Sequence, residues 1–138
     1  MIPRRGTAAG RKLILLLREV QKILDAEVLV GAEKLDMEVY TAFGADLMSD
    51  VLAFADSGCL LLTGLTNPQV IRTADVLDIA AIILVRGKRP PPETLRAAAD
   101  KNIPVLSTKY ILFESAGRLY EKGIVGSTQK VDGRRVRL

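Results

Sequence analysis

The chain has 138 residues, of which 49% are hydrophobic and 26% are charged, and its formal net charge is +4. This length predicts one domain with an ordinary core, and the apolar content excludes a disordered protein. No apolar run reaches the roughly 18 residues of a membrane span, so we expect a cytoplasmic protein without a membrane segment. The sequence has no histidine and one cysteine, which removes Ser-His pairs, Cys-His pairs and zinc-ligand spacing. Neither a metal nor a cofactor is therefore expected.

The positive charge lies at the two ends of the chain. The first 12 residues carry four cations and no acid, and the last nine carry a net charge of +3, which leaves −3 for the remainder. We therefore expect a flexible basic lead over 1–11, a single domain over 12–125 and a basic tail over 126–138. Such tails could make the protein a transcriptional regulator, but few aromatic residues are present for base stacking. Nucleic acid is not an expected partner.

The first third of the chain predicts a helix followed by strands. Apolar residues recur at helical spacing over 12–25, and a short strand and turn follow at 27–31. Residues 37–43 alternate between apolar and polar, which predicts a strand near the edge of a sheet.

A second helix is predicted to begin after Asp46. The Asp46 side chain is expected to cap this helix, and Gly58 is expected to end it. Asp46, Ser49 and Asp50 share the first turn, where acidic side chains complement the helix dipole. We interpret these three residues as structural and keep them as secondary candidates for contact with a ligand.

Three continuous apolar runs follow, each ending in a turn and a helical pattern. They cover residues 59–63, 81–85 and 103–106. Their starts lie about 22 residues apart, the length of a strand and a crossover helix, and continuous apolarity is typical of strands covered on both faces. The pattern predicts a three-layer α/β/α fold with a mostly parallel sheet. The turns after the three strands should then lie side by side and form a binding crevice.

Ten residues of these turns are candidates for ligand binding. They are Thr63, Gly64, Thr66, Asn67, Arg86, Gly87, Lys88, Arg89, Ser107 and Thr108. The first turn leads into a helix with proline as its first residue, where free backbone amides favour an anion. The second turn carries three cations beside a glycine, which would suit a phosphate-bearing ligand.

The third turn has two possible roles. Ser107 and Thr108 form an N-cap pair for a helix over 109–122, and capping alone explains both hydroxyls. The same hydroxyls could instead donate to a phosphate. The chain has neither a P-loop nor a Gly-x-Gly-x-x-Gly turn, so ATP hydrolysis and dinucleotide binding have no support.

Several blocks of the sequence together resemble the DRTGG domain. They lie at 44–51, 63–68, 82–90, 103–108 and 117–120. The family occurs as stand-alone proteins and as modules in phosphotransacetylases and CBS-containing pyrophosphatases, with a related domain in HPr kinase. The resemblance implies a non-catalytic, usually dimeric module that regulates or binds a ligand.

The chain departs from the motif that names this family. Leu65 and Thr66 replace the Asp-Arg pair, and Arg86-Gly87-Lys88 stands in place of Thr-Gly-Gly, whereas Thr63, Gly64 and Gly87 are retained. We expect a homodimeric regulatory or ligand-sensing module without catalytic activity. One alternative is a binder of a nucleotide or phosphorylated metabolite at the strand ends. Another is an enzyme of phosphoryl or acyl transfer, or an accessory subunit of such a partner enzyme, with Asp46, Asp50 and Lys88 as its only candidates.

Overall fold

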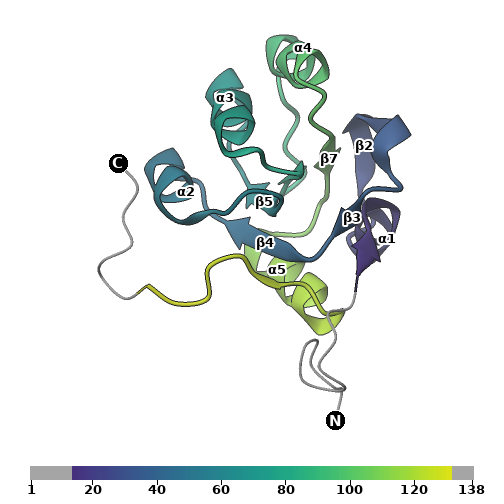
Figure 1. Ribbon diagram of the computed structural model, residues 1–138. Helices are drawn as coiled ribbons and strands as arrows, with labels where there is room; N and C mark the ends of the chain where they lie inside the picture. Colours follow the sequence, from purple (N-terminus) through teal and green to yellow (C-terminus); the bar gives the residue numbers. More distant parts are fainter. Residues whose placement is uncertain (1–13, 132–138) are drawn as a thin grey trace.

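The computed structural model describes residues 14–131, which form a sheet between two layers of helices (Figure 1). Within these residues the main sheet has six strands and a second sheet has two. In spatial order, the strands of the main sheet are β2 (Glu27–Val30), β7 (Val105–Ser107), β6 (Ala81–Leu84), β5 (Leu60–Thr63), β4 (Thr41–Gly44) and β8 (Val125–Gly126). The second sheet pairs β1 (Leu15–Leu16) with β3 (Glu38–Val39), and a 3-10 helix η1 covers Ala32–Lys34.

The main sheet is parallel except at one edge. β4, β5, β6 and β7 pair in parallel with their neighbours, β8 joins β4 in parallel, and β2 runs antiparallel to β7. The predicted parallel β-α-β-α-β unit is confirmed as β5, β6 and β7 with their connecting helices. The carboxyl ends of five consecutive parallel strands therefore meet at one edge of the sheet.

Among the described residues, five helices cover the two faces of the sheet. The helices on one face are α2 (Met48–Phe54), α3 (Pro68–Leu77) and α4 (Pro92–Asp100), and those on the other are α1 (Leu17–Ile23) and α5 (Leu112–Glu121) (Figure 1). Alternate strand residues point to opposite faces. Leu61 and Ile82 pack in the core beneath α2, α3 and α4, whereas Leu62 and Ile83 pack in the core beneath α1 and α5. The predicted three-layer α/β/α fold is confirmed.

The first helix is shorter than its apolar stripe predicts. It begins at Leu17, because Leu15 and Leu16 form β1 and pair with Val39 and Glu38. The strand predicted over 37–43 is divided in the same way. Its first part is β3 of the small sheet, and its second part is β4, which lies one strand from the edge of the main sheet.

Two predictions for α2 are wrong. The residue before the first turn of α2 is Leu47, so Asp46 is not its cap. The helix ends at Phe54 with Ala55 as its C-cap, which places Gly58 in the following loop rather than at the helix end. Asp46 lies between β4 and α2 and bonds the turn after β5, whereas Gly58 lies in the loop before β5.

The beginnings of α3 and α5 also differ from prediction. Asn67 occupies the N-cap position of α3 and Pro68 is its first residue, as predicted, but the Asn67 side chain makes no capping hydrogen bond. α5 begins only at Leu112, so Ser107 and Thr108 do not cap it. Their hydroxyls are free to bond elsewhere along the edge of the sheet.

The described residues include no helix that is both long enough and apolar enough to span a membrane. The basic lead over 1–11 and most of the basic tail over 126–138 lie outside the described residues. The domain boundary at residue 125 stays a prediction.

Candidate functional site

The turns after β5, β6 and β7 lie side by side, as the sequence predicts. Val85 donates its backbone N–H to the carbonyl oxygen of Thr63 at 3.0 Å, and Thr108 donates to Leu84 at 2.9 Å. Gly87 donates to the carbonyl oxygen of Thr108 at 2.8 Å. Backbone hydrogen bonds therefore hold the three turns in register at the carboxyl edge of the sheet.

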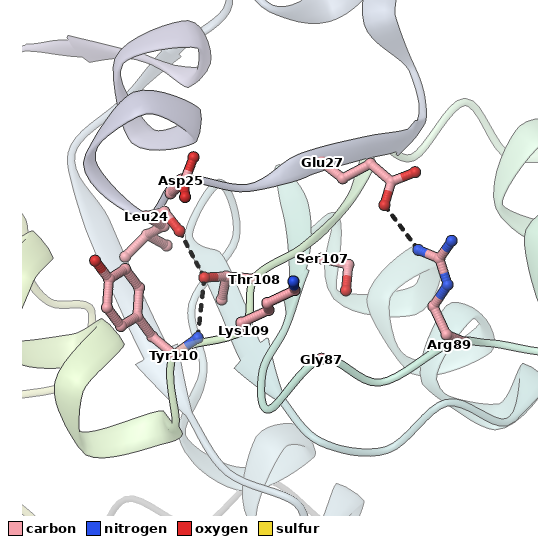
Figure 2. Close-up of a pocket in the computed structure, with 9 residues that line it drawn as sticks. All are labelled: Leu24, Asp25, Glu27, Gly87, Arg89, Ser107, Thr108, Lys109 and Tyr110. Atoms are coloured by element: carbon pink, nitrogen blue, oxygen red, sulfur yellow. Dashed lines mark hydrogen bonds and ion pairs between the residues drawn. The ribbon is translucent and has the colours of Figure 1, made fainter.

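A cleft of about 800 Å³ opens at this edge, between the end of α1, β2 and the turns after β6 and β7 (Figure 2). Its lining residues are Leu24, Asp25, Glu27, Gly87, Arg89, Ser107, Thr108, Lys109 and Tyr110. Four of these residues were predicted from the sequence, namely Gly87, Arg89, Ser107 and Thr108. Leu24, Asp25 and Glu27 were missed because the sequence does not show that β2 lies beside β7. Lys109 and Tyr110 were missed because the sequence predicts a helix over 109–122, whereas α5 begins only at Leu112.

The cleft has acidic groups on one wall and basic groups on the other. Asp25 and Glu27 come from the connection after α1 and from β2, whereas Arg89 and Lys109 follow β6 and β7. An Arg89 guanidinium nitrogen lies 2.7 Å from a Glu27 carboxylate oxygen, which links the two walls. In the view of Figure 2, Tyr110 and Arg89 lie at opposite ends of the cleft and Lys109 extends its ammonium between them.

The two hydroxyls predicted as caps or phosphate donors stabilise the cleft instead. Thr108 donates its Oγ1 hydroxyl to the carbonyl oxygen of Leu24 at 2.6 Å, and Thr108 Oγ1 itself accepts from the N–H of Tyr110 at 3.3 Å (Figure 2). Ser107 donates its hydroxyl to the carbonyl oxygen of Lys88 at 3.1 Å. Thr108 therefore joins the end of α1 to the end of β7.

Tyr110 is held from outside the cleft. Its backbone carbonyl accepts from the N–H of Arg86 at 2.9 Å, and the guanidinium carbon of Arg118 lies 4.1 Å from the centre of its ring. This distance fits a cation–π contact, which fixes the ring that forms one end of the cleft. Arg118 in turn bonds Glu114, four residues earlier on α5, at 3.0 Å.

The turn after β5 lies on the other side of β6 and forms a second polar cluster. Asp46 accepts, through Oδ1, from the N–H of Gly64 at 2.7 Å and from the hydroxyl of Thr63 at 3.2 Å. Its Oδ2 lies 3.9 Å from a guanidinium nitrogen of Arg86. The amide that the sequence assigned to an external anion is thus already bonded to a carboxylate of the chain.

Arg86 and Gly87 connect this cluster with the cleft. Both have positive φ angles, 65° for Arg86 and 66° for Gly87, a conformation that non-glycine residues rarely adopt. The turn directs the Arg86 side chain toward Gly64, whereas Gly87 lines the cleft. This two-residue turn therefore contributes one residue to the polar cluster and one to the cleft.

The remaining predicted residues lie outside the cleft lining. Thr66 uses its carbonyl oxygen to accept from the Thr94 hydroxyl at 2.7 Å, which ties α4 to this loop. Asn67 and Lys88 are exposed, as are Ser49 and Asp50 on α2. Lys109 lines the cleft, whereas Lys88 does not, and the sequence signal for Lys109 is its position directly after Thr108 in the third turn.

Comparisons with known proteins agree with this architecture. A sequence model of the DRTGG domain matches residues 19–121. No curated protein matches the chain. Among solved structures, the chain is similar to the CBS and DRTGG domains of the regulatory region of Clostridium perfringens pyrophosphatase, complexed with its activator diadenosine tetraphosphate.

The structural match has a TM-score of 0.63 at 19% sequence identity, and it covers 86% of this chain and 51% of that chain. The chain thus spans about half the length of the pyrophosphatase region, and this likeness supports the fold alone. The sequence match extends from α1 to the last residue of α5 and includes the turns at the carboxyl edge of the sheet. The protein belongs to the DRTGG domain family.

Proposed function

We propose that this DRTGG domain is a non-catalytic regulatory module that binds a small anionic ligand, a nucleotide or a phosphorylated metabolite, in the cleft at the carboxyl edge of the sheet. The observation that carries this proposal is the cleft itself, with Lys109 and Arg89 on one wall. Its volume of about 800 Å³ lies within the range of small-molecule sites, roughly 300 to 1,000 Å³.

The charges of the cleft favour a ligand with more than one kind of group. A phosphate would accept from Lys109 and compete with Glu27 for Arg89, and charge-assisted hydrogen bonds of this type are the strong ones. Asp25 and Glu27 on the opposite wall would accept from hydroxyl or amino groups. A nucleotide offers both a phosphate and such donors, whereas a simple inorganic anion offers only the first.

The structural relative supports a nucleotide as the first ligand to test. The Clostridium perfringens pyrophosphatase region is complexed with diadenosine tetraphosphate, which its description names as an activator. That region also contains CBS domains, and the present chain spans about half of it. Because the description of that region names its ligand as an activator, we propose that the present module regulates a partner enzyme.

The contacts of the three catalytic candidates also favour a regulatory role. The carboxylate of Asp46 is engaged by Thr63 and Gly64, and neither Asp50 nor Lys88 lines the cleft. A phosphoryl- or acyl-transfer site would need a nucleophile and a base within hydrogen-bond reach of each other.

Calorimetric titration of the full chain with adenine and guanine nucleotides, acyl phosphates and pyrophosphate tests the cleft. A ligand should bind, and Lys109→Ala and Arg89→Ala should each weaken binding about 10- to 100-fold, the cost of one charge-assisted contact. Lys122→Ala and Arg96→Ala are matched controls, because both side chains are exposed on other parts of the surface. No binding, or equal losses in the controls, would contradict the proposal.

We also propose that the module is a homodimer that pairs through an exposed stripe on α5. The stripe consists of Phe113, Ala116, Gly117 and Tyr120, which recur at helical spacing. Phe113 is 84% exposed and Tyr120 is 48% exposed. A Cβ added at Gly117 would meet nothing within 4 Å, so the centre of the stripe is open.

The order of side-chain sizes along the stripe favours a second copy as the occupant. Phe113 and Tyr120 flank the two small residues. If the α5 helices of two copies pack antiparallel, Phe113 of each copy lies against Tyr120 of the other, and the small residues lie where the helices cross. An apolar groove of about 160 Å³ adjoins Tyr120, where it is lined by β4 and β8 residues. Such an interface is isologous, which two-fold symmetry requires.

Sedimentation equilibrium of the full chain at micromolar concentration tests this pairing. The wild-type chain should have twice the mass of one chain, and Phe113→Asp should reduce it to that of a monomer. Val76→Asp is a matched control, because Val76 is 75% exposed on α3. A monomeric wild-type chain, or dimers that persist in Phe113→Asp, would contradict pairing through α5.

A further inference from the structure

The cluster after β5 has the composition of an oxyanion site. The N–H of Gly64, the hydroxyl of Thr63 and the guanidinium of Arg86 all face one carboxylate, that of Asp46. The donors lie at the ends of β5 and β6, whereas the carboxylate belongs to the connection between β4 and α2. A backbone amide, a hydroxyl and a guanidinium are the donors with which proteins bind carboxylates and phosphates.

The donors are positioned before any anion arrives. Thr63 is fully buried, and its Oγ1 accepts from the N–H of Leu65 at 3.2 Å, so its proton is available to Asp46. Gly64 is also buried, and the charged guanidinium of Arg86 occupies the space that a side chain would take at this position. A Cβ at this position would lie 2.2 Å from a guanidinium nitrogen of Arg86, so only glycine lets the guanidinium lie against the turn.

The acceptor, in contrast, is accessible to solutes. The side chain of Asp46 is 55% exposed and that of Arg86 is 46% exposed. The carboxylate contacts two buried donors, at Thr63 and Gly64, and one partly exposed donor, at Arg86, while its other side faces solvent. The Asp46 side chain can therefore leave the donors without disturbing the core.

We propose that Thr63, Gly64 and Arg86 form an oxyanion-binding site in which Asp46 is an internal occupant, and that a carboxylate or phosphate monoester from outside displaces it. This site lies across β6 from the cleft and does not depend on ligand binding there. A phosphate monoester carries close to two negative charges at neutral pH, whereas Asp46 carries one. The extra charge favours the phosphate at Arg86, and the tether of Asp46 sets the concentration that a ligand must exceed.

Asp46→Ala opens the site and allows a direct test by anion rescue. Removal of the carboxylate should lower the melting temperature. Sodium phosphate or sodium acetate should restore the melting temperature until the effect saturates, whereas sodium chloride at equal ionic strength should not. Phosphate should bind this variant at least about tenfold more tightly than it binds wild-type protein, since the competing carboxylate is gone. Rescue at a lower concentration of phosphate than of acetate would identify a phosphate group as the external ligand. Rescue at a lower concentration of acetate would identify a carboxylate.

Three further variants make the test specific. Asp50→Ala removes an exposed acid from the neighbouring helix and should show no rescue. Asp46→Asn keeps an acceptor oxygen and leaves no vacancy, so it should fold and respond no more than wild-type protein. Asp46→Ala combined with Arg86→Ala should lose the rescue by at least tenfold, as expected for loss of a charge-assisted contact.

The Gly64 amide gives a second readout that does not rely on stability. Its nitrogen–proton resonance should shift on titration of Asp46→Ala with phosphate, because the amide regains an acceptor. An unmoved resonance, or equal rescue of Asp46→Ala and Asp50→Ala, would overturn the proposal. Rescue that survives the loss of Arg86 would do the same.

Discussion

At the scale of single residues, Gly31 shows how closely the backbone is packed beside β7. Its φ angle is +88°, and a Cβ added to it would lie 2.8 Å from the backbone Cα of Pro104. Gly58 has a similar φ angle of +82°, but a Cβ there would meet nothing within 4 Å. A substitution at Gly58 therefore tests the conformational cost alone, whereas one at Gly31 tests the conformational cost together with steric overlap.

Alanine should destabilise the protein more at Gly31 than at Gly58. The left-handed conformation costs a non-glycine residue about 1 to 2 kcal/mol at either position. Overlap with Pro104 should add about 1 to 3 kcal/mol at Gly31 alone, because backbone atoms cannot move aside as a side chain can. Urea unfolding of Gly31→Ala and Gly58→Ala measures both values, and equal losses would show that the contact with Pro104 can relax.

The buried thiol of Cys59 predicts a dependence of stability on pH. Burial raises the pKa of the Cys59 thiol from 9.0 to about 11. Above pH 9 the thiol of the unfolded chain loses its proton, while the folded chain keeps it up to about pH 11. This contribution to stability is therefore complete below about pH 9 and is lost as the pH rises toward 11.

The free energy of unfolding should fall by about 2 kcal/mol between pH 9 and 11 because of this group, out of about 3 kcal/mol for the whole shift. Other groups also titrate in this range, so the measurement is the difference between wild-type protein and Cys59→Ala in urea at each pH. The difference should shrink steadily as the pH rises. A difference that stays constant would mean that the folded thiol titrates normally.

At the scale of elements, β8 completes the sheet beyond β4. Val125 donates its N–H to Tyr40 at 3.3 Å, Ser127 donates to Ala42 at 3.0 Å, and the hydroxyl of Thr128 bonds the carbonyl oxygen of Phe54 at the end of α2. These few contacts join both the sheet and a helix to the last described segment of the chain.

Truncation after Ile124 should therefore destabilise the fold, although the sequence places the end of the domain near this point. Loss of the three hydrogen bonds should cost about 2 to 4 kcal/mol, at about 0.5 to 1.5 kcal/mol for each. A chain that ends at Lys130 keeps all three bonds and is the control. Thermal unfolding of both chains checks this, and equal melting temperatures would place the domain boundary at residue 125 after all.

At the scale of the whole molecule, the two cores share one sheet. Leu61 and Leu62 are neighbours in β5 and both are buried, but Leu61 packs beneath α2, α3 and α4 and Leu62 beneath α1 and α5. Because the same strands supply both cores, neither core can unfold while the other stays intact. The molecule should unfold in a single transition.

Leu61→Ala and Leu62→Ala should each lower the stability by about 2 to 5 kcal/mol, the usual range for a cavity left by leucine in a core. Both variants should keep a single calorimetric transition with equal calorimetric and van't Hoff enthalpies. Two resolved transitions in either variant would show that the layers unfold separately. A negligible loss in one variant would mean that its core can collapse around the cavity.

The sequence predicted those features that depend on neighbouring residues. Continuous apolarity in three runs predicted the parallel centre of the sheet, and the turns after these runs supplied Gly87, Arg89, Ser107 and Thr108 of the cleft. Apolar periodicity was less reliable at the element ends. β1 replaced the start of a predicted helix, because Leu15 and Leu16 pair with β3 more than 20 residues away.

Only the tertiary structure decided which partners the polar side chains have. Asp46 and Thr108 both resemble helix caps in sequence, yet Asp46 bonds Gly64, 18 residues away, and Thr108 bonds Leu24, 84 residues away. The ion pair between Glu27 and Arg89 joins residues 62 apart, and it exists because β2 pairs antiparallel with β7 at the sheet edge. Local pattern determines the type of each element, because periodicity decides which side chains are buried. The order of strands determines the site, because only that order decides which turns become neighbours.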